Sequence, residues 1–474
     1  MSRARVVVVG AGPAGMMAAA QAARLGCEVV LVDEALRPGG QIHRQPPPSL
    51  AGGAVSAAAR PEAERKRRLF DRFARYSGSI DHRPGTSVTA VYGLDRILIA
   101  DETSSQLIRA DALVVATGLH ERVVPVPGWT LPGVVTAGAL QALLKGGRVR
   151  AGDRIAFAGA GPLPLVAAAQ MVEAGATVPV VALLRPPWSP LWPGLLRDPA
   201  ALWAGRGVLS EGWRWLSVLR RAGVPVLTRH VALSVSGDGA AERLVIARHD
   251  GHGRPVPGTE QRFAADTVAF NHGFTANSDL ARMAGAETRF DPRRGGWLPV
   301  RDSDGATSVP GLFVAGDAGG LAGGLAAACD GAVVGAAAAG WALHRDAGRF
   351  AAQAATDRAE RARHWTFQAA LAPSWELPPD IHALVTPATV VCRCEGVTRA
   401  RIDRAIADGH DGLNGLKRNT RAGMGSCGGR SCLRTLAALA GPRGEGEAVN
   451  ARPGIRPVAL AALANRVSDE SVGS

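Results

Sequence analysis

The chain has 474 residues, too many for one ordinary hydrophobic core, so we expect two or three domains. Apolar residues make up 47% of the sequence and charged residues 20%, which is typical of a soluble globular protein. The net charge of +13 comes mostly from scattered arginines, without the basic stripes and interleaved aromatic residues of nucleic-acid binding, so we expect no nucleic-acid partner.

The N-terminus has the pattern of a dinucleotide-binding fold. The β-branched run Arg5–Val9 predicts a buried parallel strand, and the helix that follows is expected to reach Arg24. Between them, Gly10 permits a tight turn, Gly12 lets the backbone approach a pyrophosphate, and Gly15 lets helix and strand pack closely. The positive end of the helix dipole then faces the phosphates.

An acidic residue at the end of the next strand completes this pattern. The strand is predicted at Glu28–Val32 and leads to Asp33 and Glu34, where a carboxylate accepts hydrogen bonds from a ribose. The spacing favours Asp33, with Glu34 as the alternative. Because strand, glycine turn, helix, second strand and acid occur in order, the sequence predicts a nucleotide site rather than a glycine-rich turn without a ligand.

Three further segments resemble, in order and spacing, those of the large flavoprotein group with two dinucleotide domains that includes the pyridine-nucleotide-disulfide reductases. They are Gly39-Gly40-Gln41, the strand Ala112–Ala116 that ends in Thr117-Gly118, and the strand Gly311–Ala315 that ends in Gly316-Asp317. The resemblance implies that Gly316-Asp317 contacts the ribityl chain and phosphates of FAD. It places Gly40-Gln41 beside the flavin and Thr117-Gly118 over the phosphate turn, so FAD is the expected cofactor.

Three other stretches bear on membrane contact. The run Arg65–Arg75 predicts a solvated amphipathic helix, and contact with an anionic membrane or an acidic partner stays open. Val6–Val9 is too short for the apolar region of a signal peptide. The Gly/Ala-rich stretch Val314–Leu343 carries Asp317 and Asp330, so a buried helix with close backbone contacts explains it better than a membrane span. We therefore expect no transmembrane segment.

A second strand–turn–helix unit begins at Asp153–Ala158 and continues into Gly159-Ala-Gly161-Pro162-Leu-Pro164. Pro164 replaces the third glycine, and its ring obstructs close helix–strand packing. The next strand, predicted at Val178–Leu184, is followed by Arg185 instead of an acid. Arg185 could hold the 2′-phosphate of NADPH, but the Pro-Pro-Trp that follows argues for a repurposed loop. A structural relic or interface, another adenine nucleotide and NAD(P)H all stay open, with the candidate contacts Gly159, Gly161, Pro162 and Arg185.

The segment from Pro186 to Trp215 is unusually rich in tryptophan, with indoles at Trp188, Trp192, Trp203, Trp213 and Trp215. Tryptophan at this density is typical of a buried docking surface for a partner subunit. An ordinary packed helical insertion explains it equally well.

Four of the six cysteines lie in one short C-terminal segment, as Cys392-x-Cys394 and Cys427-x4-Cys432. Four thiolates suit either zinc or a [2Fe–2S] cluster. The one-residue gap of the first pair is unusual for zinc sites, and glycines before Cys427 free backbone amides for hydrogen bonds to cluster sulfurs. This usage is not that of a secreted disulfide framework, so we expect a cytoplasmic protein, with the inner membrane face as a peripheral location that stays open.

The two motifs Cys392-Arg-Cys394-Glu395 and Gly423-Met-Gly-Ser-Cys427-Gly-Gly-Arg-Ser-Cys432 resemble the bacterioferritin-associated-ferredoxin-like [2Fe–2S] domain. The variant matched is the one appended to flavoprotein subunits of amino-acid and opine dehydrogenases. Pro38–Arg44 and Glu121–Gly133 look like the same group, which includes the α-subunits of D-hydroxyproline, opine, sarcosine and cyanide-forming glycine oxidoreductases. Gly428 departs from the glutamine common in that group, which leaves the four ligands intact.

This resemblance covers nearly the whole chain and implies an α/β fold. Two Rossmann-like dinucleotide-binding domains, as in the disulfide reductases, would precede a small helical [2Fe–2S] domain. The implied metal ligands are Cys392, Cys394, Cys427 and Cys432. The implied FAD contacts are Gly10, Ala11, Gly12, Pro13, Ala14, Gly15, Asp33, Glu34, Gly40, Gln41, Arg44, Val88, Ala116, Thr117, Gly118, Gly316 and Asp317.

The same resemblance implies an electron-relaying α-subunit of a heteromeric amino-acid or imino-acid dehydrogenase. The substrate would be oxidised on a flavoprotein β-subunit, with a small ferredoxin-like subunit as a further partner, and electrons would pass to a quinone or ferredoxin. A stand-alone NAD(P)H-dependent flavin/iron–sulfur reductase is the alternative, and a redox sensor with a vestigial flavin is a third. No catalytic residue is assigned. His120, Glu121 and His272 are near the expected flavin-facing loops, but residues in such places are more often structural, hydrogen-bonded residues than general bases.

The motifs divide the chain into five parts. The FAD-binding domain is expected at 1–118 plus 272–345, with the second nucleotide-like domain inserted at 119–271. A linker at 346–387 leads to the [2Fe–2S] domain at 388–442, whose last helix is expected to end near Gly441–Pro442. The tail, 443–474, is rich in small and charged residues and is expected to be mobile.

Overall fold

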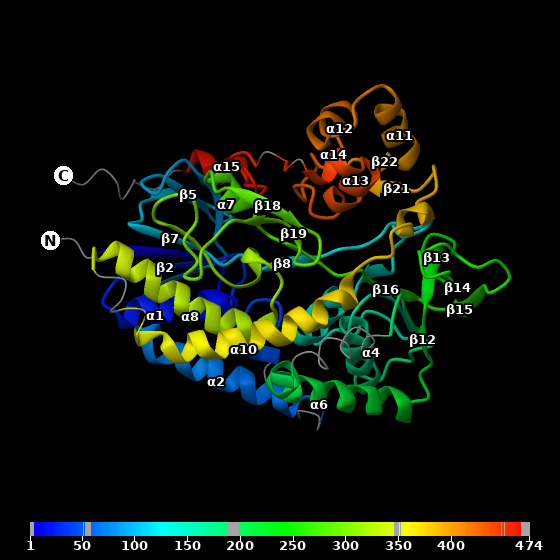
Figure 1. Ribbon diagram of the computed structural model, residues 1–474, viewed down its shortest axis with the longest axis horizontal. Coiled ribbons are helices and arrows are strands. Elements are labelled where there is room, and N and C mark those ends of the chain that lie inside the picture. The colour runs from blue at the N-terminus through cyan, green and yellow to red at the C-terminus, as the bar shows by residue number, and fades with distance from the viewer. Residues whose placement is uncertain are drawn as a thin grey trace.

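The computed structural model describes residues 4–50, 52, 58–186, 199–345, 350, 352–446, 448–449 and 451–465. Two parallel sheets lie at the two ends of the main body, and the C-terminal helical domain packs above them (Figure 1). The expected α/β fold is thus confirmed. The predicted domain boundaries stay predictions.

The first sheet is parallel, in the order β20-β7-β1-β2-β3. Its strands are β1 (Arg5–Val9), β2 (Glu28–Asp33), β3 (Ile80–Pro84), β7 (Ala112–Val115) and β20 (Leu312–Val314). Its two faces are covered differently. Helices α1 (Pro13–Arg24), α2 (Arg60–Ser77) and α8 (Gly323–Ala342) pack on one face, and an antiparallel sheet of β4 (Ser87–Val91), β5 (Ile97–Ala100) and β6 (Ser105–Ile108) packs on the other.

The second sheet is also parallel, in the order β12-β11-β10-β16-β9. Its strands are β9 (Val134–Thr136), β10 (Ile155–Gly159), β11 (Val181–Leu183), β12 (Val226–Thr228) and β16 (Thr267–Asn271). Helices α3 (Ala137–Ala142), α4 (Leu163–Glu173) and α6 (Pro199–Arg221) cover one face, and the antiparallel strands β13 (His230–Ser236), β14 (Arg243–Arg248) and β15 (Gln261–Ala264) pack on the other. The helical turn Leu143–Gly147 extends α3.

Short elements join the two halves. The antiparallel pair β8 (Leu119–Glu121) and β17 (Phe274–Ala276) carries the chain out to the second sheet and back. After it come α7 (Asp279–Met283) and the hairpin of β18 (Thr288–Asp291) and β19 (Gly296–Pro299). This order, with one sheet inserted in the other's sequence, is the discontinuous arrangement that the motifs predict.

The Gly/Ala-rich helix α8 packs against α1 with its backbone in close approach. A Cβ at Gly331 would lie 2.0 Å from the carbonyl oxygen of Ala14, and one at Gly335 would lie 2.4 Å from that of Ala18. By length and composition α8 alone, among the described helices, could cross a membrane, but 78% of its apolar window is buried inside the structure. The prediction of a buried helix with close backbone contacts is confirmed.

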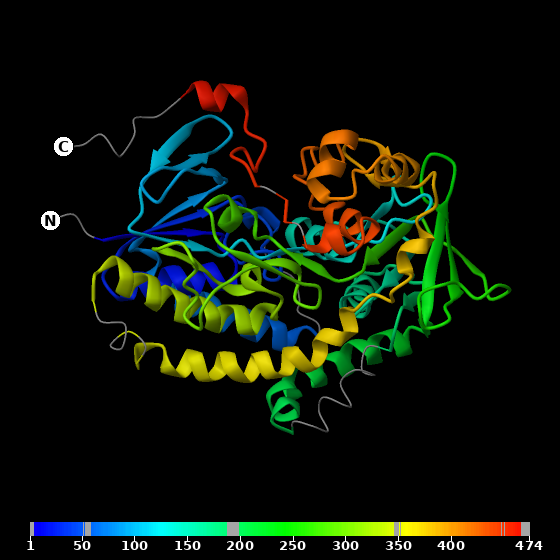
Figure 2. The ribbon, with the colours of Figure 1, turned by 45° about the horizontal axis from the view of Figure 1, so that its top comes forward.

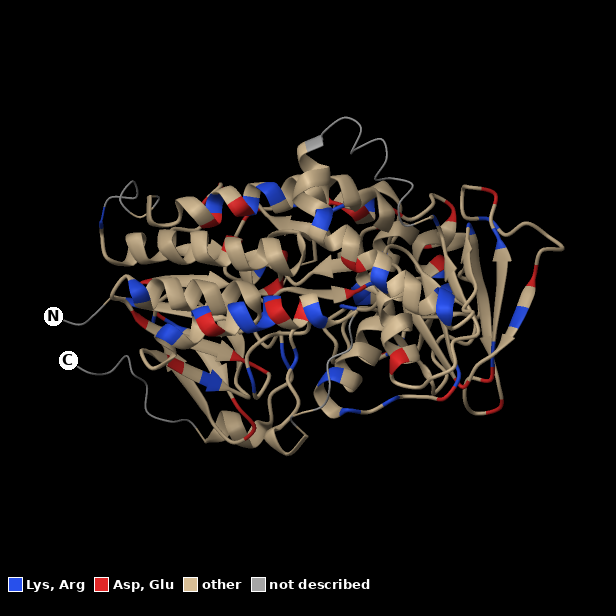
Figure 3. Ribbon diagram, turned by 90° about the horizontal axis from the view of Figure 1, so that it is seen from below, with Lys and Arg blue, Asp and Glu red and all other residues tan. Residues whose placement is uncertain are grey.

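The predicted amphipathic helix is also confirmed, as α2, which buries Leu69 and Phe73. Its arginines are paired along the exposed face and with the linker helix α10 (Ala355–Leu371), where Arg72 and Asp357 approach to 2.9 Å. Cations and anions are interspersed over the helices of the face seen in Figure 3. The charge of α2 is therefore largely used within the chain.

The tryptophan-rich segment divides between core and surface. Trp215 is buried in the core under the second sheet, whereas Trp203 and Trp213 are 69% and 71% exposed on α6. Trp188 and Trp192 lie outside the described residues. A role for this surface in subunit docking stays a prediction.

The C-terminal domain is a small helical unit on a two-stranded ribbon. Its elements are β21 (Val390–Cys392), β22 (Val397–Thr398), α11 (Arg399–Ala407), α12 (Leu413–Thr420), α13 (Leu433–Leu439) and α14 (Pro442–Gly446). The helix α13 ends at Leu439, close to the predicted end near Gly441–Pro442, and a further short helix, α14, begins at Pro442. A left-handed Gly441 closes α13, and proline is favoured at the first position of a new helix.

The tail differs from the expected mobile segment over residues 451–465. The backbone amides of Gly454 and Ile455 donate to the Thr89 carbonyl at 3.0 and 3.2 Å. The tail then forms α15 (Leu460–Ala464) above the β4–β6 sheet (Figure 2). Composition predicts mobility, but these backbone hydrogen bonds attach the segment to the half that contains the first sheet.

Candidate functional site

The glycines of the first turn are required by close backbone contacts. Gly10 has φ +101°, and a Cβ there would lie 2.5 Å from the Ala116 carbonyl oxygen. A Cβ at Gly15 would lie 1.7 Å from the Gly10 carbonyl oxygen. The strand–turn–helix geometry predicted from the sequence is therefore present, with Pro13 and Ala14 in the first turn of α1.

A second segment approaches the same helix N-terminus. Gly40 has φ +61°, and a Cβ there would lie only 2.9 Å from the Cα of Gly12. The two glycines, 28 residues apart, thus form a backbone surface without side chains. Gln41 is exposed beside it. Such a surface at the positive end of a helix is suited to the phosphates of a dinucleotide.

Unpartnered polar atoms next to this surface also fit a bound cofactor. Within the described part of the chain, Nδ1 of His43 and Nε of Arg44 are buried without a hydrogen-bond partner. Burial lowers the pKa of His43 to about 4, so the imidazole is neutral near pH 7. Buried polar groups are normally paired, and these two are placed for a ligand.

The two acidic candidates at the end of β2 have different partners. Asp33 accepts hydrogen bonds from the amides of Ala11 and, at 2.6 Å, Ala35, and burial raises its pKa. Glu34 is ion-paired with Arg456 of the tail. Asp33 thus supports the glycine turn, and the predicted ribose contact of either residue stays a prediction. Arg456 was missed, since nothing in the sequence places the tail at this edge.

The remaining FAD candidates lie in the half of the molecule that contains this turn. Thr117 donates through Oγ1 to the carbonyl of Asn277 at 2.6 Å, and Gly118 is left-handed. Ala116 borders Gly10, and Val88 is buried between the two sheets of the first half. The structure brings these residues to one half of the molecule, and their contacts with a cofactor stay predictions.

Gly316-Asp317 begins the segment that leads into α8. Gly316 has φ +64°, and a Cβ there would lie 2.6 Å from that of Ala14. The buried Asp317 carboxylate accepts from the amides of Ala322 and Gly323 at 2.8 and 2.9 Å, and burial raises its pKa. The motif is therefore packed directly on α1.

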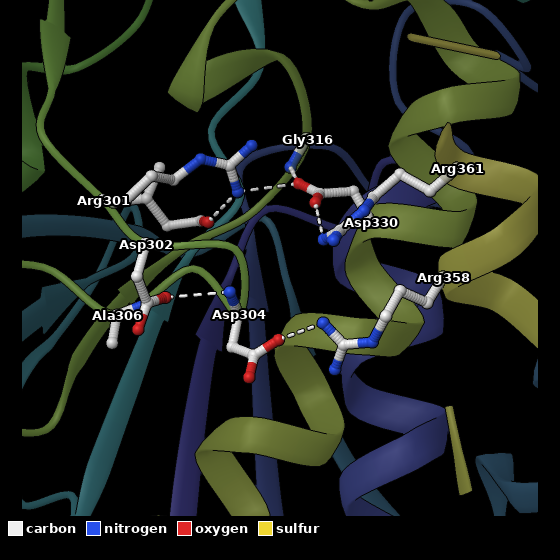
Figure 4. Close-up of polar contacts among 9 residues, drawn as sticks. Arg301, Asp302, Asp304, Ala306, Gly316, Asp330, Arg358 and Arg361 are labelled. Atoms are coloured by element: carbon white, nitrogen blue, oxygen red, sulfur yellow. Dashed lines mark hydrogen bonds and ion pairs between the residues drawn. The ribbon is translucent and has the colours of Figure 1, made fainter. Parts of the chain in front are cut away.

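A buried carboxylate that the sequence did not single out as a site residue holds this motif in place. Asp330 of α8 accepts hydrogen bonds, each at 2.8 Å, from the Gly316 amide and from the guanidinium groups of Arg301 and Arg361 (Figure 4). Asp330 is 1% exposed. Arg361 belongs to α10, so the network ties the linker helix to the FAD motif. The sequence feature that could have pointed to Asp330 is that it is a single acidic residue in an otherwise apolar helix.

The four cysteines lie together as two couples. Cys392 and Cys432 are each 1% exposed, and the thiol of Cys432 donates to Cys392. This hydrogen bond, helped by the Gly423 amide, lowers the pKa of Cys392 to about 6. Cys394 and Cys427 form the second couple nearer the surface.

This donor set fits a [2Fe–2S] cluster. The four cysteines supply the four thiolates that a [2Fe–2S] cluster takes over its two irons. Amides aimed at sulfur, as at Cys392, stabilise the thiolate form that cluster ligands take.

The second dinucleotide-like turn has the expected glycine geometry but a different neighbour. A Cβ at Gly159 would lie 1.7 Å from the Asn271 carbonyl oxygen. A Cβ at Gly161 would lie 2.3 Å from Nε1 of Trp375, a residue of the linker. Pro162 precedes α4, and Arg185 lies 4.0 Å from Glu376. Linker side chains therefore meet this turn.

Comparison with known proteins identifies both parts of the chain. Residues 4–191 and 214–330 match the pyridine nucleotide-disulphide oxidoreductase family, and residues 390–440 match the BFD-like [2Fe–2S] binding domain. The chain belongs to the pyridine nucleotide-disulphide oxidoreductase family. This member is an FAD-dependent oxidoreductase that carries a C-terminal BFD-like [2Fe–2S] domain, as the resemblance predicted.

Its relatives are components of multi-subunit enzymes. One of the opine oxidase subunits of Agrobacterium tumefaciens (strain Ach5) is 32% identical over 97% of this chain and 91% of that protein. The hydrogen cyanide synthase component HcnB of Pseudomonas aeruginosa is 35% identical over 90% of this chain and 91% of that protein. L-proline dehydrogenase from P. horikoshii shares the fold, with 19% identity and a TM-score of 0.68 over 98% of this chain and 80% of that one.

In this family member the BFD-like domain packs directly on the FAD-binding half. Arg430 lies 3.8 Å from Asp279 of α7, and Arg434 stacks 4.9 Å from the Phe290 ring. A Cβ at Gly296 would lie 2.5 Å from Nη1 of Arg434. Residues between and beyond the last two cysteines thus form the contact between the two cofactor-binding parts.

Of the three residues considered for proton transfer, His272 is buried, whereas His120 and Glu121 are partly buried. Glu121 accepts from the Gly138 amide at 2.9 Å and from Asn271 at 2.8 Å. His272 accepts from the Val124 amide at 3.3 Å. His120 borders a cavity of about 20 Å³ beside Arg430, and burial lowers its pKa to about 4. Glu121 and His272 have structural partners, and no catalytic residue is assigned.

Proposed function

We propose that this chain is the FAD- and [2Fe–2S]-carrying electron-transfer component of a heteromeric dehydrogenase. An amino acid or imino acid would be oxidised on a partner flavoprotein β-subunit, and the electrons would pass through this chain to a one-electron acceptor. A small ferredoxin-like subunit would be a further partner. The names of the relatives, components of opine oxidase and hydrogen cyanide synthase, support this assignment.

The observation that carries the proposal is the direct contact between the cluster loop and the FAD-binding half. The loop that joins Cys427 to Cys432 lies against α7 through Arg430 and Asp279. When bound, FAD supplies two-electron chemistry and the cluster one-electron chemistry, so their combination suits a relay that splits electron pairs. The chain's own residues hold the cluster domain against the half that carries the FAD motifs.

The alternative, a stand-alone NAD(P)H-dependent reductase, finds less support. It requires a dinucleotide at the second turn, where the linker residue Trp375 packs on Gly161. It also requires a cation for the 2′-phosphate or an acid for the ribose. The cation, Arg185, lies beside Glu376, whose carboxylate would repel a phosphate.

The test is to express this chain with the genes adjacent to its own, and to purify the assembly without oxygen. We expect FAD, about two irons and about two acid-labile sulfides per chain. One member of an amino-acid and opine panel should bleach the flavin and reduce the cluster, and only when the partner is present. Rapid bleaching of the isolated chain by NADPH or NADH, without any effect of the panel, would contradict the proposal.

A further inference from the structure

The linker that precedes the cluster domain crosses the second dinucleotide-like fold at its glycine turn. After α10 and the turn Ala372–Trp375, the indole of Trp375 lies against Gly161. Gly161 is the second glycine of the turn, where the backbone of a working dinucleotide fold approaches the pyrophosphate. The indole therefore lies where a pyrophosphate would bind.

Several residues hold the indole in this position. Nη2 of Arg122 donates to the Trp375 carbonyl at 3.2 Å. The Phe274 ring meets the indole edge-on, with centroids 6.4 Å apart, and a Cβ at Gly273 would lie 3.5 Å from that of Trp375. These contacts come from β17 and the segments flanking β8, the connections between the two halves.

The next residue places a carboxylate in the other half of the same site. Glu376 lies 4.0 Å from Arg185, which follows β11 at the position that would bind the 2′-phosphate of an adenine dinucleotide. Glu376 is also ion-paired with Arg293 of the FAD-binding half. The indole fills the space on the glycine turn, and the Glu376 carboxylate gives Arg185 an anion where a 2′-phosphate would lie.

We propose that Trp375 and Glu376 occupy the dinucleotide site of the second fold as an intrachain ligand. The site then accepts a 2′-phosphorylated adenine dinucleotide only when the linker is displaced. One observation argues that the linker is displaceable. Nε1 of Trp375 is buried without a hydrogen-bond partner among the described residues, so no directional bond holds the ring itself.

The experiment measures binding of NADP⁺ and NAD⁺ to the oxygen-free holoprotein by calorimetry. NADP⁺ is used because it cannot reduce the flavin. Wild type should show no saturable binding below about 1 mM, and Trp375→Ala/Glu376→Gln should bind NADP⁺ at least about tenfold more tightly. Glu376→Gln alone, which leaves the indole in place, should raise the NADP⁺ affinity by a smaller factor and leave the NAD⁺ affinity unchanged.

Matched controls use residues that are outside the second turn. Trp203→Ala removes an exposed indole of α6, and Asp380→Asn removes the carboxylate that pairs with Arg254. Both should bind as wild type does. Saturable wild-type binding of NADP⁺ with a Kd below about 1 mM would overturn the proposal. The proposal would also be overturned if the double variant kept normal FAD and iron but bound NADP⁺ no more tightly than wild type. In that case Pro164, and not the linker, would exclude the nucleotide. Amine-dependent reduction of the assembly tests the proposed function separately.

Discussion

Asp330 gives the sharpest test of how the FAD motif is held. Its carboxylate receives three hydrogen bonds, from the Gly316 amide and from Arg301 and Arg361, whose side chains are 8% and 5% exposed. Asp330→Asn keeps the shape but removes the charge, so two buried guanidinium groups lose their anion. Breaking a buried ion pair from one side costs about 3–5 kcal/mol. We expect a loss of stability in that range.

The matched control lies in the same view of the structure. Asp304 pairs with Arg358 of the same linker helix, but both side chains are about one-third exposed (Figure 4). Asp304→Asn should therefore cost about 0–1 kcal/mol. Guanidinium unfolding of the holoprotein, followed by flavin fluorescence and far-ultraviolet circular dichroism, measures both variants. If Asp330→Asn costs no more than Asp304→Asn, the idea that this network holds the FAD motif is refuted.

Three further predictions use single substitutions. Cys392→Ser should remove the iron and the paramagnetic signal of the dithionite-reduced protein, whereas Cys329→Ser should keep both; equal iron in the two would contradict the cluster site. Gly15→Ala forces a Cβ to within 1.7 Å of a carbonyl oxygen and should abolish FAD retention on gel filtration, whereas Gly78→Ala, with nothing within 4 Å, should not. Burial lowers the pKa of His43 from 6.5 to about 4, so its contribution to stability is complete above pH 6.5 and is lost as the pH falls towards 4. His43→Gln should flatten the fall in unfolding free energy over this window, and an unchanged slope would argue against a buried neutral imidazole.

The first nucleotide fold could be predicted from sequence because its requirements are local. Gly10, Gly15 and the strand Glu28–Asp33 follow one another within a single strand–turn–helix–strand unit, and each glycine is required by a contact within that unit or its neighbouring strand. The cysteines could be recognised for the same reason, since their spacing is a local property. The buried Asp330 was visible as a lone acid in an apolar helix, but its two arginine partners come from distant segments.

What sequence could not give is where segments far apart in the chain meet. Nothing local to Trp375 or Glu376 indicates that they meet Gly161 and Arg185, more than 190 residues earlier. The contact of the tail could not be predicted for the same reason, because its richness in small and charged residues says nothing about the Thr89 carbonyl that receives its amides. Contacts between distant segments depend on the surfaces that form when the chain folds, and these surfaces cannot be deduced from the order of the residues alone.

The linker contacts have a consequence for the proposed electron transfer. A flexible tether would leave the cluster domain free to move, and the gap between the two cofactors would then vary. Here Glu376 pairs with Arg293 of the FAD-binding half, and Nε1 of Trp129 donates to the Val390 carbonyl at 2.6 Å, just before the first cluster cysteine. The cluster domain is thus fixed to both halves of the flavoprotein. While Trp375 occupies the second turn, the second dinucleotide-like fold provides the surface on which the linker is held.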